Sequence, residues 1–219
     1  MTARGGLRRF VGPPVAPEPS TVAQPTQPAQ SAVERCELCA TPVDSGHGHV
    51  VDVEQRSIMC ACRACYLLFT REEAGGGRFR AVPDRYLRDL ERPISPADWD
   101  GLGVPVGSAF FLRTEHGLAA FYPSPAGATE CLLDLDAWSG LAGTHPLLAE
   151  AAPEVEAILV RRTADAVDYF LVPVDECYEL VGLVRMYWTG FDGGPDAAGH
   201  IDEFFAGLAG RARAWKPEG

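Results

Sequence analysis

The most informative segment of the chain is residues 35–65, which read RCELCATPVDSGHGHVVDVEQRSIMCACRAC. It holds five of the chain's seven cysteines, as two Cys-x2-Cys pairs with one further cysteine just before the second pair. A thiolate is both a nucleophile and a soft metal ligand, and two such pairs at this separation supply four sulfurs for one tetrahedral ion. The segment therefore predicts a metal site.

We expect the ligands to be the four cysteines of the two pairs, Cys36, Cys39, Cys62 and Cys65. Each pair forms a tight turn that directs both sulfurs at one ion, and the β-branched residues between the pairs indicate a short hairpin. Two such turns on a hairpin predict a zinc-ribbon-like or treble-clef-like module over residues 35–70. Because so short a module cannot be held together by burial, the ion would supply its folding energy. Disulfides or free buried thiols are the alternative.

The fifth sulfur of the segment belongs to Cys60, and three interpretations of it stay open. It is a spare thiol packed in the second strand, it replaces Cys62 as a ligand, or all five cysteines serve an iron–sulfur cluster. Thiolate-rich sites accept both metals, so zinc is the expected cofactor and iron or an iron–sulfur cluster is the alternative. His47 and His49 lie between the pairs, either as substitute ligands or as polar residues of a turn and a strand edge.

The regions on either side of the module differ in composition. Residues 1–34 hold six prolines among Ala, Gln, Ser and Thr, which predicts a disordered arm. Residues 71–219 mix strand and helix patterns with hairpin signals between neighbouring strands, typical of an acidic α+β domain with an antiparallel sheet. Expected strands cover 78–83, 106–114, 118–122, 157–162 and 169–174. Expected helices cover 134–141, 175–188 and 201–215, and 84–90 is expected to be a short helix or turn.

Few residues of the acidic domain indicate a chemistry. The stretch 121–130 is expected to be a rigid loop, or else the wall of a small-molecule pocket between Tyr122 and Glu130, and it matches neither a phosphate-binding loop nor a nucleophile elbow. Cys131 and Cys177 stand alone in apolar surroundings, where a free cysteine behaves as a small hydrophobe. Asp175 is expected to cap the helix that follows it.

Charge and hydropathy exclude some classes of partner. Residues 96–219 carry seven basic and nineteen acidic groups, which disfavours binding to a nucleic-acid backbone. The chain has no run of about 18 apolar residues, so we expect no membrane-spanning helix. Cys-x2-Cys pairs in a chain that lacks a recognisable export signal favour metal binding over disulfides, and we expect a cytoplasmic protein.

Several stretches resemble an uncharacterised actinobacterial family whose members are encoded beside genes for nickel–iron uptake hydrogenases; they are 35–39, 59–65, 76–85, 120–130 and 172–182. The resemblance covers about residues 35–210. It implies a setting, near hydrogenase biogenesis or electron transfer, and no particular reaction. The expected function is therefore a non-catalytic, metal-binding accessory or assembly protein whose partner is a hydrogenase subunit or maturation factor. The alternatives are an iron–sulfur redox protein that exchanges electrons with a hydrogenase, and an enzyme with a pocket between Tyr122 and Glu130.

Overall fold

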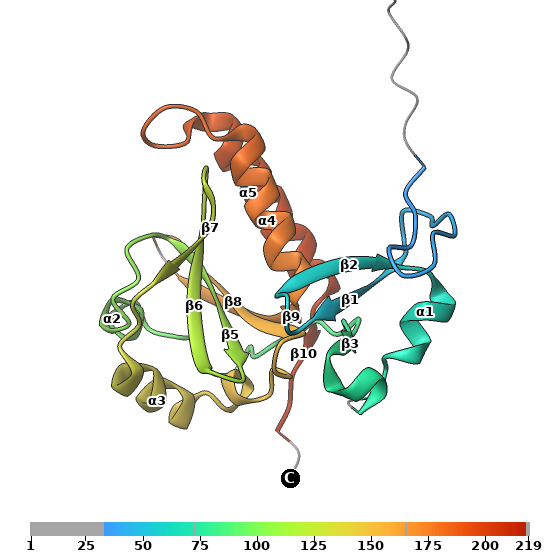
Figure 1. Cartoon of the computed structure of the whole chain (residues 1–219). Coiled ribbons are helices and arrows are strands. Elements are labelled where there is room, and N and C mark those ends of the chain that lie inside the picture. The colour runs from blue at the N-terminus through green and yellow to red at the C-terminus, as the bar shows by residue number, and fades with distance from the viewer. Residues whose placement is uncertain (1–32, 72, 165, 218–219) are drawn as a thin grey trace, which may run out of the picture. The chain divides into compact units, whose positions relative to one another are not determined.

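In the computed structural model, which describes residues 33–71, 73–164 and 166–217, the strands form two sheets (Figure 1). The smaller sheet is antiparallel, has the order β2-β1-β3, and consists of β1 (Gly48–Asp52), β2 (Ser57–Ala61) and β3 (Phe79–Ala81). Strands β1 and β2 are the predicted hairpin. Helix α1 (Arg63–Leu68) and the 3-10 turn η1 (Ala74–Gly77) connect β2 to β3.

The larger sheet has seven strands in the order β10-β4-β9-β8-β5-β6-β7. All neighbours are antiparallel except β10 and β4, which are parallel. The strands are β4 (Leu87–Arg88), β5 (Ser108–Thr114), β6 (Gly117–Ser124), β7 (Gly127–Cys131), β8 (Glu156–Arg162), β9 (Val167–Pro173) and β10 (Arg213–Ala214). The mixed α+β fold with antiparallel sheets is therefore confirmed.

Helices cover both faces of the larger sheet. One face packs against α2 (Pro96–Gly101), α3 (Leu135–Thr144) and the 3-10 turn η2 (Pro146–Ala149), and the other against α4 (Val174–Tyr187) and α5 (Gly194–Arg211). Figure 1 shows α4 and α5 as a pair of neighbouring long helices. In the part of the chain that the structure describes, no helix has the length and apolar character needed to cross a bilayer.

The sequence of the central strand β8 is apolar at successive positions, without alternating apolar and polar residues, because both faces of the strand are buried. Ile158 and Val160 lie in the core beneath α2 and α3, whereas Ala157 and Leu159 lie in the core beneath α4 and α5. Successive side chains of a strand point to opposite faces, so a strand that is covered on both faces is apolar at every position. The same two-sided burial holds for β5 and β9, and these three strands are adjacent at the centre of the larger sheet.

The prediction of a rigid loop over residues 121–130 was wrong. Strand β6 continues to Ser124, and a tight turn through Pro125 and Ala126 leads into β7 at Gly127. The two prolines suggested a loop because proline cannot donate to a strand ladder. Pro123 is tolerated because β5 pairs with β6 only as far as Phe121, so the end of β6 has a neighbour on one side only.

Two smaller expectations also need correction. The predicted helix or turn at 84–90 contains the short strand β4, which pairs with β9 and β10. The last helix begins at Gly194 instead of residue 201, because Pro195 occupies its first turn, where a missing backbone N–H costs nothing. Strand β4 forms because distant strands pair with it, and local sequence patterns carry no signal for such pairing.

The smaller sheet packs on the larger through a few apolar side chains, Val51, Val82, Val155 and Val174. Residues from Val33 onward form one compact unit by their contacts. The boundary expected at residue 70 stays a prediction, and the arm expected over 1–34 lies outside the described residues except for Val33 and Glu34.

Candidate metal centre

The four cysteines of the two Cys-x2-Cys pairs converge on one point. One sulfur from each of Cys36, Cys39, Cys62 and Cys65 lies within 4.8 Å of every other. The Sγ atoms of Cys39 and Cys62 are 3.7 Å apart. A tetrahedral ion with metal–sulfur bonds of about 2.3 Å separates its sulfurs by about 3.8 Å, so this spacing fits a shared ion. All seven cysteines are free thiols in the structure, with no disulfide between the pairs.

Local backbone structure explains how the first pair is shaped. The amide of Ala40 donates to the carbonyl of Cys36 at 2.7 Å, and the amide of Cys36 donates to the carbonyl of Thr41 at 2.8 Å. Ala40 has a φ of 60°, a left-handed conformation that costs an L-residue roughly 1 kcal/mol. This turn brings both sulfurs to the same side of the loop.

The second pair straddles the start of helix α1. Cys62 is the N-cap residue of α1 and its carbonyl accepts from the amide of Tyr66 at 2.9 Å, so Cys65 follows within the first turn. The first pair is tied to the end of β2 by two hydrogen bonds. The amide of Glu37 donates to the carbonyl of Cys60 at 2.9 Å, and the amide of Cys60 donates to the Glu37 carboxylate at 2.7 Å.

The protonation of the cluster is uneven in the absence of an ion. The hydroxyl and backbone of Thr41 lower the pKa of the Cys39 thiol to about 6, and burial raises the pKa of Cys65 to about 12. Burial raises the pKa of Cys36, but the backbone amides of Cys62, Leu38 and Cys39 outweigh it and the net pKa is lowered. One cysteine is thus prepared as a thiolate while Cys65 keeps its proton, so binding of a cation must release protons.

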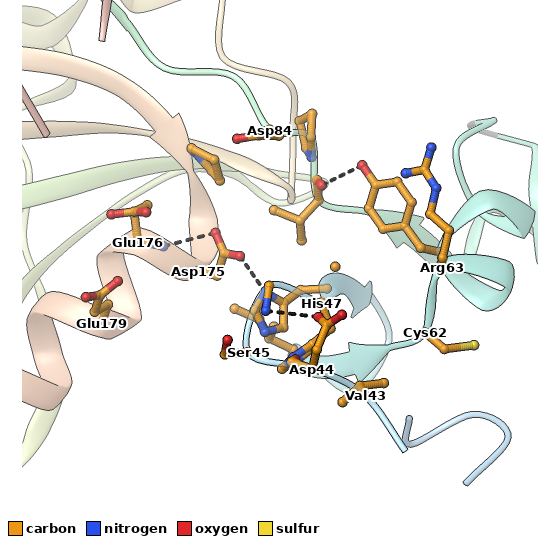
Figure 2. A pocket seen from close by; sticks show the side chains of 18 of the residues that line it. Val43, Asp44, Ser45, His47, Cys62, Arg63, Asp84, Asp175, Glu176 and Glu179 are labelled. Carbon is orange, nitrogen blue, oxygen red and sulfur yellow. Dashed lines mark hydrogen bonds and ion pairs between the residues drawn. The ribbon is translucent and has the colours of Figure 1, made fainter. Parts of the chain in front are cut away.

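A cleft of about 1060 Å³ lies beside this cluster, between the smaller sheet and the start of α4 (Figure 2). Its walls include Cys62, Tyr66 and the loop before β1 on one side and Asp175 and Glu179 of α4 on the other. Figure 2 shows Asp175 directed across the cleft toward the loop that carries Asp44 and His47. The Asp175 carboxylate accepts a hydrogen bond from Nδ1 of His49 at 2.6 Å, which raises the pKa of that histidine.

The comparison with protein families matches a family model described as a family of unknown function, DUF5947, over residues 35–212. The chain belongs to this family. Curated proteins and solved structures gave no match. The DUF5947 region starts at Arg35, one residue before the first cysteine, so it contains the whole cysteine segment and leaves out the proline-rich arm.

Within the DUF5947 region, the structure separates Cys60 from the other cysteines of the segment. Its sulfur lies within 4.8 Å of one ring nitrogen of His47 and one of His49, and it does not belong to the four-sulfur cluster. The assignment of Cys36, Cys39, Cys62 and Cys65 as ligands stays a prediction that this geometry favours. Sequence reasoning treated the two histidines as minor candidates, and the hairpin register was the signal that would have placed them beside Cys60.

Asp175 has a different place from the one expected. Helix α4 begins at Val174, with Pro173 as its N-cap, so Asp175 lies in the first turn and contacts His49 instead of capping. Its neighbour Glu176 is buried, and accepts hydrogen bonds from Arg211 and from the hydroxyl of Tyr86. The acidic start of α4 therefore serves contacts with other parts of the chain as well as the helix dipole.

The residues weighed for an enzyme do not form a nucleophile and base in the described part of the chain. Cys177 is fully buried between the sheet and α5, and burial raises its pKa well above the usual value. Cys131 pairs across to Ala120 on β6, and burial raises its pKa too. A smaller cavity of about 200 Å³ is lined by His116, Glu130 and others, but Cys131 is not among its lining residues.

Tyr66 fastens the cysteine-bearing end of α1 to the hairpin. Its hydroxyl donates to the carbonyl of Val82 at 3.0 Å, and a Cβ at Gly48 would lie only 2.5 Å from its ring. We expect Gly48→Ala to displace this ring and to lower the free energy of unfolding by about 1–3 kcal/mol, measured by denaturant titration. Gly46→Ala is the matched control, because its added Cβ would meet nothing closer than 3.8 Å. Equal stability of the two variants would contradict the packing role of Gly48.

Proposed function

We propose that the cluster of Cys36, Cys39, Cys62 and Cys65 binds one structural zinc ion and that the smaller sheet is a zinc-ribbon-like module. The convergence of the four sulfurs within 4.8 Å is the observation that carries this proposal. Helix α1 supports it as well. None of its residues is buried, and Leu67 and Leu68 are 50% and 65% exposed, so hydrophobic burial does little to hold this helix in place. A bound ion would supply the missing constraint.

The spacing favours a single ion over an iron–sulfur cluster. A multi-iron cluster inserts several irons and sulfides between its thiolates, which separates the thiolates more widely than one ion does. The fifth cysteine, which a cluster of all five would need, lies with the two histidines instead. Four thiolates around one tetrahedral ion are the usual ligand set of a structural zinc site.

Colour and metal content test this proposal. We expect protein purified without oxygen to be colourless and to hold zinc bound by the four-sulfur cluster. Cys39→Ser should remove that zinc, while Cys131→Ser, a control distant from the cluster, should leave it unchanged. A coloured protein that contains iron and loses its colour in Cys39→Ser would favour the redox alternative.

We further propose that the protein is a non-catalytic accessory or assembly factor in the cytoplasm that binds a hydrogenase subunit or maturation factor. The gene setting implied by the resemblance to hydrogenase-associated proteins supports this partner. The excess of acidic groups in residues 96–219 supports a partner surface of positive charge, because complementary charge speeds association. Affinity purification from cells that express the hydrogenase should recover one of its components, and failure to do so would contradict this assignment.

A further inference from the structure

The hairpin places two imidazoles and a thiol on one face of the smaller sheet. His49 of β1 is the register partner of Cys60 of β2. Directly opposed residues of an antiparallel pair project to the same side of the sheet with their Cβ atoms about 4.5–5.5 Å apart. His47 lies two residues before His49 and therefore on the same side. One ring nitrogen from each histidine and the Cys60 sulfur all lie within 4.8 Å of one another.

Hydrogen bonds fix which nitrogen of each ring has a lone pair to offer. Nδ1 of His47 lies 2.6 Å from the carbonyl oxygen of Asp44, and a carbonyl only accepts, so this nitrogen carries the proton. Nδ1 of His49 lies 2.6 Å from the Asp175 carboxylate and carries its proton for the same reason. In its neutral form each ring would therefore present an unprotonated Nε2, which is the form of histidine that binds metals.

His47 supplies a second observation that points to a ligand. Its side chain is only 9% exposed. Its Nε2 is buried and has no hydrogen-bond partner among the described residues. A buried acceptor without a partner lowers the stability of the fold by roughly 1–3 kcal/mol. A ligand that contacts this nitrogen would offset that loss. A cation beside Nε2 would be such a ligand.

The surrounding carboxylates favour a cation. Asp175 engages Nδ1 of His49 and leaves Nε2 available to a metal, and in many proteins a carboxylate orients a metal-bound histidine through its other ring nitrogen in this way. Glu37 accepts from the amide of Cys60 at 2.7 Å, and the Glu34 carboxylate lies 3.8 Å from Nδ1 of His47. Three acidic groups thus surround two imidazoles and one thiol.

We propose that His47, His49 and Cys60 form a second metal site, separate from the four-cysteine cluster, which binds a divalent transition cation of the zinc class. Two imidazoles and a thiolate suit a borderline-soft ion, and the Cys60 thiol would lose its proton on binding. Three protein ligands leave at least one position of a tetrahedral ion for water or another small ligand. Both histidines also line the cleft beside α4, which gives such a ligand access.

Metal content per chain tests this proposal with the full-length protein. Dialysed against zinc and then freed of excess ion, the wild type should hold about two ions per chain. Cys60→Ser combined with His49→Ala should hold about one. Cys39→Ser combined with Cys65→Ser should hold at most one, because loss of the ion from the four-cysteine cluster also destabilises the hairpin that carries the second site, and all four changes together should hold none. Cys131→Ser and His116→Ala serve as controls that keep both ions, and circular dichroism checks that each variant is folded.

The two proposals fail in different ways in this experiment. If the Cys60 and His49 variant holds as much zinc as the wild type, the second site is overturned and the four-cysteine site stands. If only that variant loses zinc, the four-cysteine site is overturned instead. Cobalt titration supplies an independent readout, because a thiolate bound to Co²⁺ gives a charge-transfer band, and the band due to Cys60 should be missing in Cys60→Ser.

Asp175 positions His49, so its substitution should weaken zinc binding at the second site without abolishing it. Asp175→Asn removes the charge that orients His49, and we expect the affinity of the second site for zinc to fall about 10–100-fold in a chelator competition, with the four-cysteine site unchanged. Glu179→Gln is the matched control, because Glu179 lines the same cleft but makes no hydrogen bond with His49. Equal zinc affinity in Asp175→Asn and Glu179→Gln would overturn the role of Asp175.

Discussion

Serine in place of both Cys39 and Cys65 should release the ion from the four-sulfur cluster and unfold the residues around it. Structural zinc contributes an apparent free energy of about 10–16 kcal/mol in zinc-finger peptides. Helix α1 buries none of its own residues, so little else holds it in place. We expect the amides of β1 and β2 to exchange at least about 100-fold faster with solvent, since a loss of about 3 kcal/mol of local stability already gives that factor.

Hydrogen exchange read by mass spectrometry locates this effect along the chain. The larger sheet should keep its protection, because its two cores are built from its own strands and from α2 to α5. Removal of the ion from the wild type with a chelator should reproduce the result, and Cys131→Ser should show none of it. If the chelated protein keeps the protection of β1 and β2, the ion does not hold the module together.

Arg85→Ala should destabilise the larger sheet strongly. The Glu156 side chain is completely buried at the start of β8 and accepts hydrogen bonds from Arg85 at 2.7 and 2.5 Å. Removal of Arg85 leaves a buried carboxylate without its counter-ion, which costs about 3–5 kcal/mol in proteins. Because the Arg85 side chain is 36% exposed, we expect a loss of about 3 kcal/mol, at the low end of that range.

Thermal denaturation measures this loss, which corresponds to a fall in Tm of roughly 6–12 °C for a chain of this size. Arg162→Ala is the matched control. Its ion pair with Asp100 is exposed on both sides, and such pairs contribute at most about 1 kcal/mol. A Tm for Arg85→Ala close to that of Arg162→Ala would show that Glu156 is stable without its partner. The Glu156 carboxylate also accepts from the amide of Ala152 at 2.8 Å, and this hydrogen bond alone would then have to stabilise the buried carboxylate.

Patterns along the chain were enough to predict the elements of the acidic domain that are regular and long. The expected strands at 106–114, 118–122, 157–162 and 169–174 correspond to β5, β6, β8 and β9, and the expected helix at 134–141 corresponds to α3. Ser95 is a residue type typical of a helix N-cap and caps α2, since its hydroxyl accepts from the amide of Asp98. These features depend on period and on local capping, both of which neighbouring residues determine.

The strands β4, β7 and β10 were missed for a different reason. Each is short or lies at an edge, and β4 and β10 consist of two residues each. Strands of this kind exist because a partner strand supplies their hydrogen bonds, so their own residues carry little signal. The proline-containing end of β6 was missed on the same ground, since its tolerance for Pro123 depends on where β5 stops pairing.

Spacing alone was sufficient to predict that four cysteines meet in one cluster, because two Cys-x2-Cys turns joined by a hairpin bring four sulfurs together with little help from the rest of the chain. The place of Cys60 required the three-dimensional structure. Cys60 and Cys62 are two residues apart, but β2 ends at Ala61 and Cys62 is the N-cap of α1, so one sulfur stays on the face of the hairpin and the other joins the cluster. Asp175 reaches His49 across 126 positions of sequence. Local chemistry determines which groups bind a metal, and packing between distant segments determines which of them meet.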